Sequence, residues 1–130
     1  MSIELQGQER PLKILVVDDD VASRMVLSVS LRKYGNTVIL ANSGIEAVEI
    51  CRNQPDLDLV LMDIRMPDMD GYEASQEIRK FNKDVVIITQ TSNEYKGGKL
   101  KAVEAGGNDY ISKPINFGEL KRMIDRHFNK

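Results

Sequence analysis

Four short runs of apolar, largely β-branched residues recur along the chain, and none of them alternates strictly between apolar and polar positions. Such runs are typical of strands that are buried on both faces, as in a parallel sheet covered by helices. A fifth run is weaker, and the predicted strands cover residues 13–17, 37–41, 57–62, 85–89 and 109–112. This pattern constrains the fold most, because a sheet buried on both faces needs helices on both sides.

Helical patterns occupy the segments between these runs. Leu27, Leu31 and Tyr34 lie on one helical face, and Gly35 supplies a stop signal. The sequence Ser-Gly-Ile-Glu at 43–46 is typical of a capping box that opens the next helix. The predicted helices cover residues 20–34, 72–81 and 94–105, and two more begin at 43–46 and at 116–119.

Strands and helices therefore alternate along the chain in five successive β/α units. Short loops and right-handed crossovers fold such a chain into one doubly wound parallel sheet. For five strands we expect the flavodoxin-like order 2-1-3-4-5, with the functional crevice at the carboxyl ends of the first and third strands. The predicted fold class is α/β, a single (βα)5 domain.

Acidic residues end both strands that border this crevice. Asp18, Asp19 and Asp20 follow the first strand, and Asp63 follows the third. The strand order brings these groups together although they are far apart in the chain. Neighbouring carboxylates repel one another and require a counter-charge, and hard oxygen ligands at this density suit Mg²⁺.

Two further polar groups lie at the same edge of the predicted sheet. Lys113 ends the fifth strand, and Thr91 follows the fourth. A carboxylate nucleophile, a divalent cation, a lysine and a hydroxyl together suit phosphoryl transfer, in which an Asp oxygen attacks and the other groups hold the phosphoryl oxygens.

Four segments carry a family resemblance. The sequences KILVVDDD, LVLMDIRMPDMDGYE, TQTS and DYISKPI resemble the receiver domain of two-component response regulators, in the order and spacing of that family. The resemblance covers residues 13 to about 128, nearly the whole chain, and is close to the receivers of hybrid histidine kinases. The chain is then expected to be either a free-standing regulator or a receiver excised from such a kinase.

The resemblance implies specific roles for the acidic groups. Asp63 matches the phosphoacceptor of the family. Asp18 and Asp19 match the acidic pair that holds Mg²⁺ (or Mn²⁺) together with Asp63, and the backbone carbonyl of Arg65 matches a further ligand.

It also implies the residues that respond to the phosphate. Lys113 matches the phosphate-contacting lysine, and Thr91 matches the switch hydroxyl, with Ser92 as the small residue beside it. Tyr110 matches the aromatic residue that turns inward after phosphorylation. Pro114 matches a proline that follows a cis peptide bond in the family, so the bond between Lys113 and Pro114 is a candidate cis peptide bond.

The implied function is that of a phosphoacceptor in a phosphorelay. A histidine kinase or a histidine phosphotransfer protein supplies the phosphoryl group from a phospho-His. The surface of the fourth helix, fifth strand and fifth helix then changes, and a downstream protein or domain reads it. The domain catalyses its own phosphorylation and dephosphorylation in the cytoplasm, without a turnover substrate in the usual enzyme sense.

Several of these residues have structural alternatives. Asp20 is better explained as the N-cap of the first helix than as a metal ligand. Thr89 competes with Thr91 as the hydroxyl, but it lies inside the predicted strand rather than just beyond it.

Other polar residues are expected to be structural. Asp68 and Asp70 are interpreted as turn formers around Gly71. His127, near the end of the last helix, is expected to be solvated, and Cys51 to be a small core residue.

Composition excludes several other classes of protein. The net charge of −2 and the pI of about 5.4 indicate no basic face for nucleic acid. A single cysteine allows no internal disulfide, and no apolar run reaches the roughly 20 residues of a membrane helix. We expect residues 1–11 to form a flexible tail and residues 12–130 to form one domain.

Three rival functions remain to be weighed. A phosphatase of the haloacid-dehalogenase kind needs a second acid two residues after its nucleophile, where this chain has Arg65. A flavin carrier needs a hydroxyl-rich phosphate loop after the first strand, where this chain has three aspartates. A receiver-like protein–protein interaction module that takes no phosphate stays open.

Overall fold

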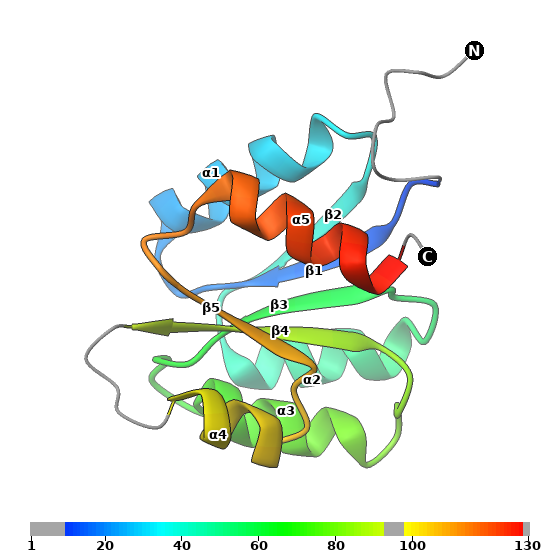
Figure 1. Ribbon diagram of the computed structural model, residues 1–130. Coiled ribbons are helices and arrows are strands. Elements are labelled where there is room, and N and C mark those ends of the chain that lie inside the picture. The colour runs from blue at the N-terminus through cyan, green and yellow to red at the C-terminus, as the bar shows by residue number, and fades with distance from the viewer. Residues whose placement is uncertain (1–9, 93–97, 129–130) are drawn as a thin grey trace.

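The structure is a computed structural model that describes residues 10–92 and 98–128. The predicted strands are present as one parallel sheet in the order β2-β1-β3-β4-β5, so the predicted fold class is confirmed (Figure 1). The strands are β1 (Lys13–Val17), β2 (Thr37–Ala41), β3 (Leu59–Asp63), β4 (Val86–Ser92) and β5 (Asp109–Lys113). The helices are α1 (Val21–Arg32), α2 (Gly44–Asn53), α3 (Gly71–Arg79), α4 (Gly98–Glu104) and α5 (Phe117–Phe128).

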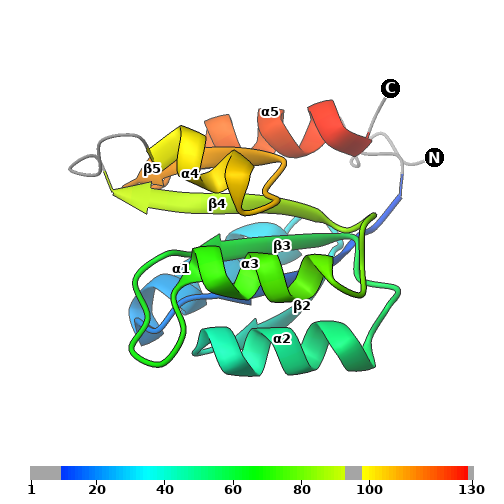
Figure 2. The same ribbon diagram turned by 90° about the horizontal axis from the view of Figure 1, so that it is seen from below.

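Two hydrophobic clusters lie on opposite faces of the sheet (Figures 1 and 2). One joins the sheet to α2 and α3, and it contains Cys51, as predicted, together with Ala74 and Ile78. The other joins the sheet to α1 and α5 through Leu27 and Leu120. Side chains on successive strand positions point to opposite faces, and both sets are buried, which explains why the strand sequences do not alternate.

The strands β3 and β4 end further along the chain than predicted. Strand β3 ends at Asp63 rather than before it, and β4 continues past Thr89 to Ser92. Asp63 pairs with Gln90, so polar residues continue the ladder after the apolar run has ended. The apolar pattern therefore placed the carboxyl ends of both strands too early, and it began β3 two residues too early, at 57 rather than at Leu59. Hydrogen bonding between strands does not depend on the polarity of their side chains.

Side chains at the helix starts explain where the helices begin. Asp20 caps α1 as expected, because its carboxylate accepts hydrogen bonds from the Ser23 amide at 2.9 Å and the Ser23 hydroxyl at 2.8 Å. Asn116 caps α5 by accepting from the amide of Glu119 at 2.9 Å. These caps satisfy amides that have no partner within the helix.

The capping box is complete at a different helix from the one predicted. Ser43 accepts from the amide of Glu46 at 3.1 Å, but the Glu46 carboxylate accepts from the amide of Asn42 rather than from that of Ser43. The reciprocal box forms at α3, where Asp70 and Glu73 exchange both hydrogen bonds. The interpretation of Asp70 as a turn former is therefore wrong, and Asp70 is the N-cap of α3.

Some predictions lie outside the described residues. These are the tail over residues 1–9 and the first part of the fourth predicted helix, residues 94–97. Within residues 10–92 and 98–128, no helix has both the length and the apolar character needed to cross a membrane.

Candidate functional site

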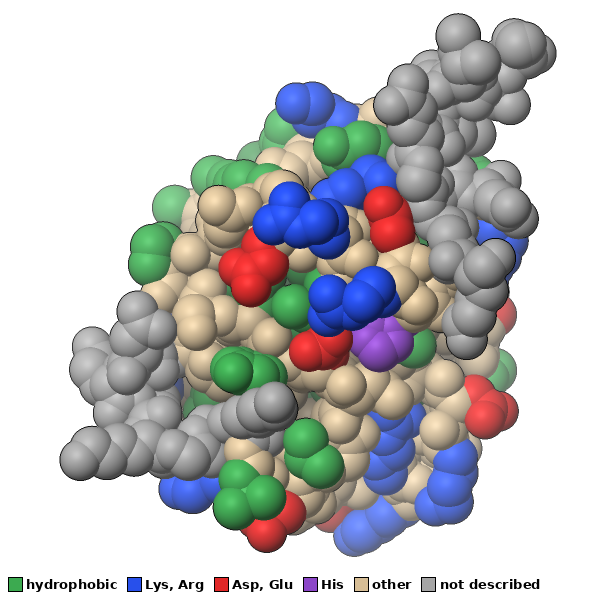
Figure 3. All heavy atoms as spheres, viewed as in Figure 1, with side chains coloured by type: hydrophobic (Ala, Val, Ile, Leu, Met, Phe, Trp, Pro, Cys, Tyr) green, Lys and Arg blue, Asp and Glu red, His purple; other side chains and the backbone are tan. Residues whose placement is uncertain are grey.

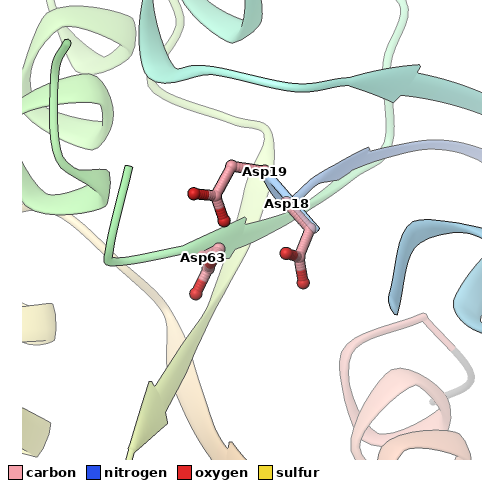
Figure 4. Close-up of side chains that lie close together, drawn as sticks. All are labelled: Asp18, Asp19 and Asp63. Carbon is pink, nitrogen blue, oxygen red and sulfur yellow. The ribbon is translucent and has the colours of Figure 1, made fainter. Parts of the chain in front are cut away.

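Three carboxyl groups meet at the carboxyl ends of β1 and β3 (Figure 4). One oxygen from each of Asp18, Asp19 and Asp63 lies within 4.8 Å of the others. Strands β1 and β3 are neighbours, and Val17 pairs with Met62, so the residues that follow these two positions lie at the same edge. The structure thus brings together the acidic residues that the strand order predicted.

Burial differs between the three carboxyl groups. Asp18 is fully buried and Asp63 is 4% exposed, whereas Asp19 is exposed. Buried carboxylates in mutual contact are unfavourable unless cations or hydrogen-bond donors compensate them. The cluster therefore requires positive charge, and oxygen atoms at this spacing form the hard donor set that Mg²⁺ prefers.

Lys113 supplies one of these positive charges. Its Nζ lies 2.9 Å from Oδ1 of Asp63 and 3.3 Å from Oδ2 of Asp18. The sequence indicated that Lys113 lies at this edge, but it did not indicate that the ammonium bridges two carboxylates. With three carboxylates and one ammonium, the cluster keeps an excess of negative charge that a divalent cation would offset.

The electrostatic environment acts on both partners of this ion pair. Burial raises the pKa of the Asp63 carboxyl, and the charges of Asp18 and Asp19 act in the same direction against the hydrogen bond from Lys113. Burial lowers the pKa of the Lys113 ammonium, but its contacts with Asp63 and Asp18 outweigh burial, so the pKa lies above its ordinary value. Lys113 is therefore charged at neutral pH.

The loop after β1 is held by hydrogen bonds that fix the position of Asp18. The Asp18 carboxylate accepts from the amide of Asp20 at 2.9 Å. Nη1 of Arg24, on α1, donates to the backbone carbonyl of Asp18 at 2.7 Å. Sequence reasoning missed Arg24, because the signal would have been only a basic residue in the first helix after an acidic loop.

Gly71 allows α3 to begin close to Asp63. A Cβ atom at Gly71 would overlap the backbone carbonyl oxygen of Asp63 and lie 3.0 Å from the Cα of Ile64. The Gly71 amide also donates to the carbonyl of Ile64 at 2.9 Å. A residue without a side chain is therefore needed where the helix meets the end of β3.

The two threonines of β4 lie in different surroundings. Thr91 is buried near the carboxyl end of β4 and pairs with Ser112, next to Lys113. The hydroxyl of Thr89 lies 3.1 Å from the position that a Cβ would take at Gly107, in the turn after α4. This position favours Thr91 over Thr89 as the hydroxyl at the site edge.

The remaining predicted site residues lie on β5, directly after it, and in the loop after β3. Tyr110 pairs with Thr89 and is half-buried, and the peptide bond between Lys113 and Pro114 is cis. Arg65 is exposed, and with Asp19 it lines an open cleft of about 590 Å³ beside the acidic cluster. The cleft opens beside Asp19, at the exposed edge of the acidic cluster.

His127 does not have the environment that we expected. Its Nε2 lies 3.2 Å from Oδ2 of Asp109, which also pairs with Arg126 at 3.0 Å. The ring is half-buried, so the prediction of a solvated histidine is wrong. The fold places the end of α5 beside the start of β5, which the sequence alone did not indicate.

Comparison with known protein families matches residues 14–125 to the family described as the response regulator receiver domain. The chain belongs to this family. Receiver domains are parts of two-component signalling systems, and the match decides against the phosphatase and flavin-carrier hypotheses. The acidic cluster described above lies at the site where the resemblance implied the phosphoacceptor.

Curated relatives confirm the family and show that this chain corresponds to one domain of them. The chain is 41% identical over 111 residues to the transcriptional regulatory protein ZraR of Klebsiella oxytoca, covering 85% of this chain and 25% of that protein. It is 39% identical over 122 residues to the hybrid signal transduction histidine kinase L of Dictyostelium discoideum, covering 88% of this chain and 7% of that protein. The chain thus spans about a quarter or less of these relatives.

Solved receiver domains have the same fold. The receiver domain of sensor histidine kinase PA1611 from Pseudomonas aeruginosa PAO1, with a magnesium ion coordinated in its active-site cleft, is 38% identical with a TM-score of 0.80 and covers 90% of this chain and 97% of that one. A second match is the co-crystal structure of the Saccharomyces cerevisiae phosphotransfer protein Ypd1 with the receiver domain of Ssk1. It has 33% identity and a TM-score of 0.82 over 88% of this chain and 86% of that one.

Proposed function

We propose that Asp63 accepts a phosphoryl group from the phospho-His of a histidine kinase or a histidine phosphotransfer protein. The observation that carries this proposal is the contact of one buried carboxylate with Lys113 at 2.9 Å, inside a cluster that includes Asp18 and Asp19. The family supports the proposal, since one matched structure pairs a receiver with a phosphotransfer protein. Because the donor phosphate derives from ATP, we propose a cytoplasmic location.

The proposed cation is Mg²⁺, or Mn²⁺, held by Asp18, Asp19, Asp63 and the backbone carbonyl of Arg65. When bound, it would neutralise charge on the transferring phosphoryl oxygens and on the carboxylates. The donor set supports this assignment because it consists of hard oxygen atoms at one sheet edge. The matched Pseudomonas receiver holds magnesium in its cleft.

The protein groups perform the transfer as follows. An oxygen of the Asp63 carboxylate forms a bond to phosphorus while the bond from phosphorus to the imidazole nitrogen breaks, and its electron pair leaves with the imidazole. Lys113 remains beside the acceptor and pairs with the phosphoryl oxygens, a charge-assisted interaction that also fixes their orientation. Hydrolysis of the acyl phosphate returns Asp63 to a carboxylate, so the domain has no separate turnover substrate.

The proposed response starts at Thr91 and Tyr110. The hydroxyl of Thr91 moves to the phosphoryl group, and Tyr110 turns toward the space that it leaves. Thr91 lies on β4 and Tyr110 lies on β5, and these strands are followed in the chain by α4 and α5. A movement of both side chains therefore changes the surface formed by α4, β5 and α5. A downstream output protein or domain is the proposed reader of this surface.

Intact-mass spectrometry after incubation with acetyl phosphate tests the assignment. The parent chain is expected to gain one phosphoryl group only with Mg²⁺, and hydroxylamine is expected to remove it, as for an acyl phosphate. Asp63→Asn should gain none, because the nucleophilic oxygen is replaced by an amide. An equal adduct in Asp63→Asn would show that the acceptor is another residue.

A missing adduct is interpreted by a second experiment. Beryllofluoride with Mg²⁺ imitates the phosphoryl group, and NMR signals of Thr91 and Tyr110 report its binding. A response would indicate a competent site that needs a protein donor. If there is neither an adduct nor a response, the phosphoacceptor assignment is rejected in favour of a phosphate-independent interaction module.

A further inference from the structure

Helix α1 presents apolar side chains to water along almost its whole exposed face. Its exposed positions are Val21, Ala22, Met25, Val26, Val29 and Arg32. Every one before the last turn is therefore apolar, and the four large apolar side chains are between 51% and 62% exposed. Figure 3 shows hydrophobic side chains over α1, whereas charged side chains gather over α5.

This face is not the one that packs on the sheet. Leu27 and Leu31 are buried on the other side of α1, in the hydrophobic cluster that joins it to the sheet. The helix is thus apolar on two sides, which is typical of a helix that is covered on both. Helix α3 is the contrast within this chain, because its exposed positions are the polar residues Glu73 and Gln76.

Opposite charges flank the apolar face at its two ends. Asp19 and Asp20 precede α1, Arg32 and Lys33 end it, and all four are exposed. Val26 lies midway between the acidic pair and the basic pair along the chain. Asp19 and Lys33 take part in no ion pair among the residues that the structure describes. The face is therefore acidic at one end, apolar in the middle and basic at the other end.

We propose that α1 is the contact surface between two copies of this chain, which pair through their α1 helices in antiparallel orientation. A two-fold axis near Val26 would place Asp19 of each copy opposite Lys33 of the other. The same axis pairs Asp20 with Arg32, and the apolar side chains meet between the charged ends. A second copy thus supplies both the apolar surface and the opposite charges that this face needs.

The charged side chains keep atoms for this contact. Asp20 uses Oδ2 to accept from Ser23, and Arg32 uses Nη2 to donate to the carbonyl of Val38. A carboxylate has a second oxygen, and a guanidinium has further N–H donors. A parallel pair is disfavoured because like charges would meet at both ends. An anionic membrane surface is disfavoured as well, because the acidic end would face it.

The size of the face indicates a weak and transient dimer. Helix α1 has 12 residues and is therefore about 18 Å long. A hollow of about 310 Å³ beside it, lined by Val26, Ile115 and Phe117 among others, extends the apolar surface. The face still comprises fewer residues than the roughly 20–30 per partner of a standard interface, so we expect association only at high protein concentration.

Self-association of the full chain tests the proposed contact. Sedimentation velocity and NMR spectra are recorded from about 10 µM to about 1 mM, the range in which a weak interface forms. We expect the apparent mass to rise with concentration from 14.7 kDa toward that of the dimer. The concentration-dependent amide signals should be those of α1, and added salt should weaken the dimer.

A substitution at the centre of the face has a matched control. Val26→Glu brings two carboxylates together at the two-fold axis, so the concentration dependence should be lost. Ile45→Glu should associate like the parent chain. Ile45 is 50% exposed, nearly the same as the 51% of Val26, but it lies on α2, which covers the opposite face of the sheet.

An exchange of charges tests the antiparallel register. Lys33→Asp should weaken the dimer about tenfold, because two repulsive pairs replace two attractive ones. Adding Asp19→Lys should restore association, since each pair is rebuilt with its charges reversed. Within one chain these two positions are separated by the whole length of α1, so recovery requires the second copy.

Three results would overturn the proposed contact: a monomer at every concentration, association that Val26→Glu leaves unchanged, or no recovery in the folded double variant. Circular dichroism establishes that each variant is folded. A monomer whose α1 signals shift only when a phosphodonor protein is added would assign the face to that donor instead. Dimerisation is measured without Mg²⁺ or phosphate, so it holds or fails independently of phosphorylation at Asp63.

Discussion

At the scale of single residues, Asp63 combines burial with a charge that the fold only partly compensates. Lys113 contacts it at 2.9 Å, yet burial and the two neighbouring carboxylates still raise its pKa. The folded chain therefore holds this proton more tightly than the unfolded chain, and stability falls as pH rises from the unfolded pKa through the folded one. Reactivity at this position has a cost in stability when no cation is bound.

The variant Asp63→Asn tests this cost. Without divalent cations, we expect its melting temperature at pH 7 to exceed that of the parent by about 3 °C or more, because the charge is lost and the shape is kept. The gain should shrink as pH falls toward the ordinary value of 3.8, because Asp63 takes up its proton at a higher pH in the folded state than in the unfolded one. Thermal unfolding followed by circular dichroism between pH 7 and pH 4 measures it.

Asp56→Asn is the control with the opposite sign. The hydrogen bond from Lys13 lowers the pKa of Asp56, so this carboxylate favours folding above its unfolded pKa and loses that effect as pH falls. Its replacement should lower the melting temperature slightly at pH 7. Equal shifts in the two variants would contradict the role of burial at Asp63.

Arg24 is the second residue whose role can be tested separately. Arg24→Ala removes the donor that holds the Asp18 carbonyl at 2.7 Å, and we expect the affinity for Mg²⁺ to fall about tenfold, as for other groups that orient metal ligands. Arg32→Ala is the matched control, because Arg32 also lies on α1 and donates to a backbone carbonyl, that of Val38, away from the cluster. Isothermal titration with Mg²⁺ compares them, and equal losses would show a general effect on α1.

At the scale of elements, the start of α3 controls where the end of β3 lies. The complete capping box of Asp70 and Glu73 defines the first turn, and Gly71 lets that turn approach the backbone of Asp63. The loop between β3 and α3 contains Arg65, whose backbone carbonyl is a proposed ligand of Mg²⁺. The position of the cleft therefore depends on one contact between a helix and a strand.

Gly71→Ala should disturb this contact. The added methyl group would overlap the carbonyl of Asp63, so α3 must move, at a cost of about 1–3 kcal/mol in the free energy of unfolding. Gly118→Ala on α5 is the control, since among the described residues its added methyl meets side chains rather than backbone, that of Asn116 at 3.2 Å and that of Arg122 at 3.7 Å. Urea unfolding of both variants measures the difference, and an unchanged Gly71→Ala protein would contradict the close approach.

At the scale of the whole molecule, negative charge is concentrated at the carboxyl edge of the sheet, where its repulsion destabilises the folded state. The cluster comprises three carboxylates and one ammonium, and its net charge equals the net charge of −2 of the entire chain. Global stability and cation binding are therefore linked, because a ligand that binds only the folded state stabilises it by mass action.

Mg²⁺ should raise the melting temperature in a concentration-dependent way. At about 100 times the dissociation constant, the expected stabilisation is about 2.7 kcal/mol. The shift should be lost in Asp19→Asn and kept in Glu49→Gln, which removes an exposed carboxylate on α2, away from the cluster. Differential scanning fluorimetry with increasing Mg²⁺ measures it, and a shift of equal size in both variants would show that the cation binds elsewhere.

Much of the architecture follows from local sequence patterns. The buried runs predicted the number of strands, and alternation with helices predicted their order, because parallel crossovers have one hand and few arrangements. The strand order in turn predicted that Asp18 and Asp19 lie beside Asp63. Boundaries at β4 and the capping partner of Glu46 were not predictable, since they depend on hydrogen bonds between segments.

Other features arise from contacts between residues far apart in the chain. Three contacts are of this kind: the bridge from Lys113 to two carboxylates, the support of Asp18 by Arg24, and the pairing of His127 with Asp109. Periodicity and propensity report the neighbours of a residue along one element, whereas these contacts depend on how packed elements orient their side chains. The sequence alone thus predicts which groups reach the sheet edge, and packing sets their distances, burial and charge balance.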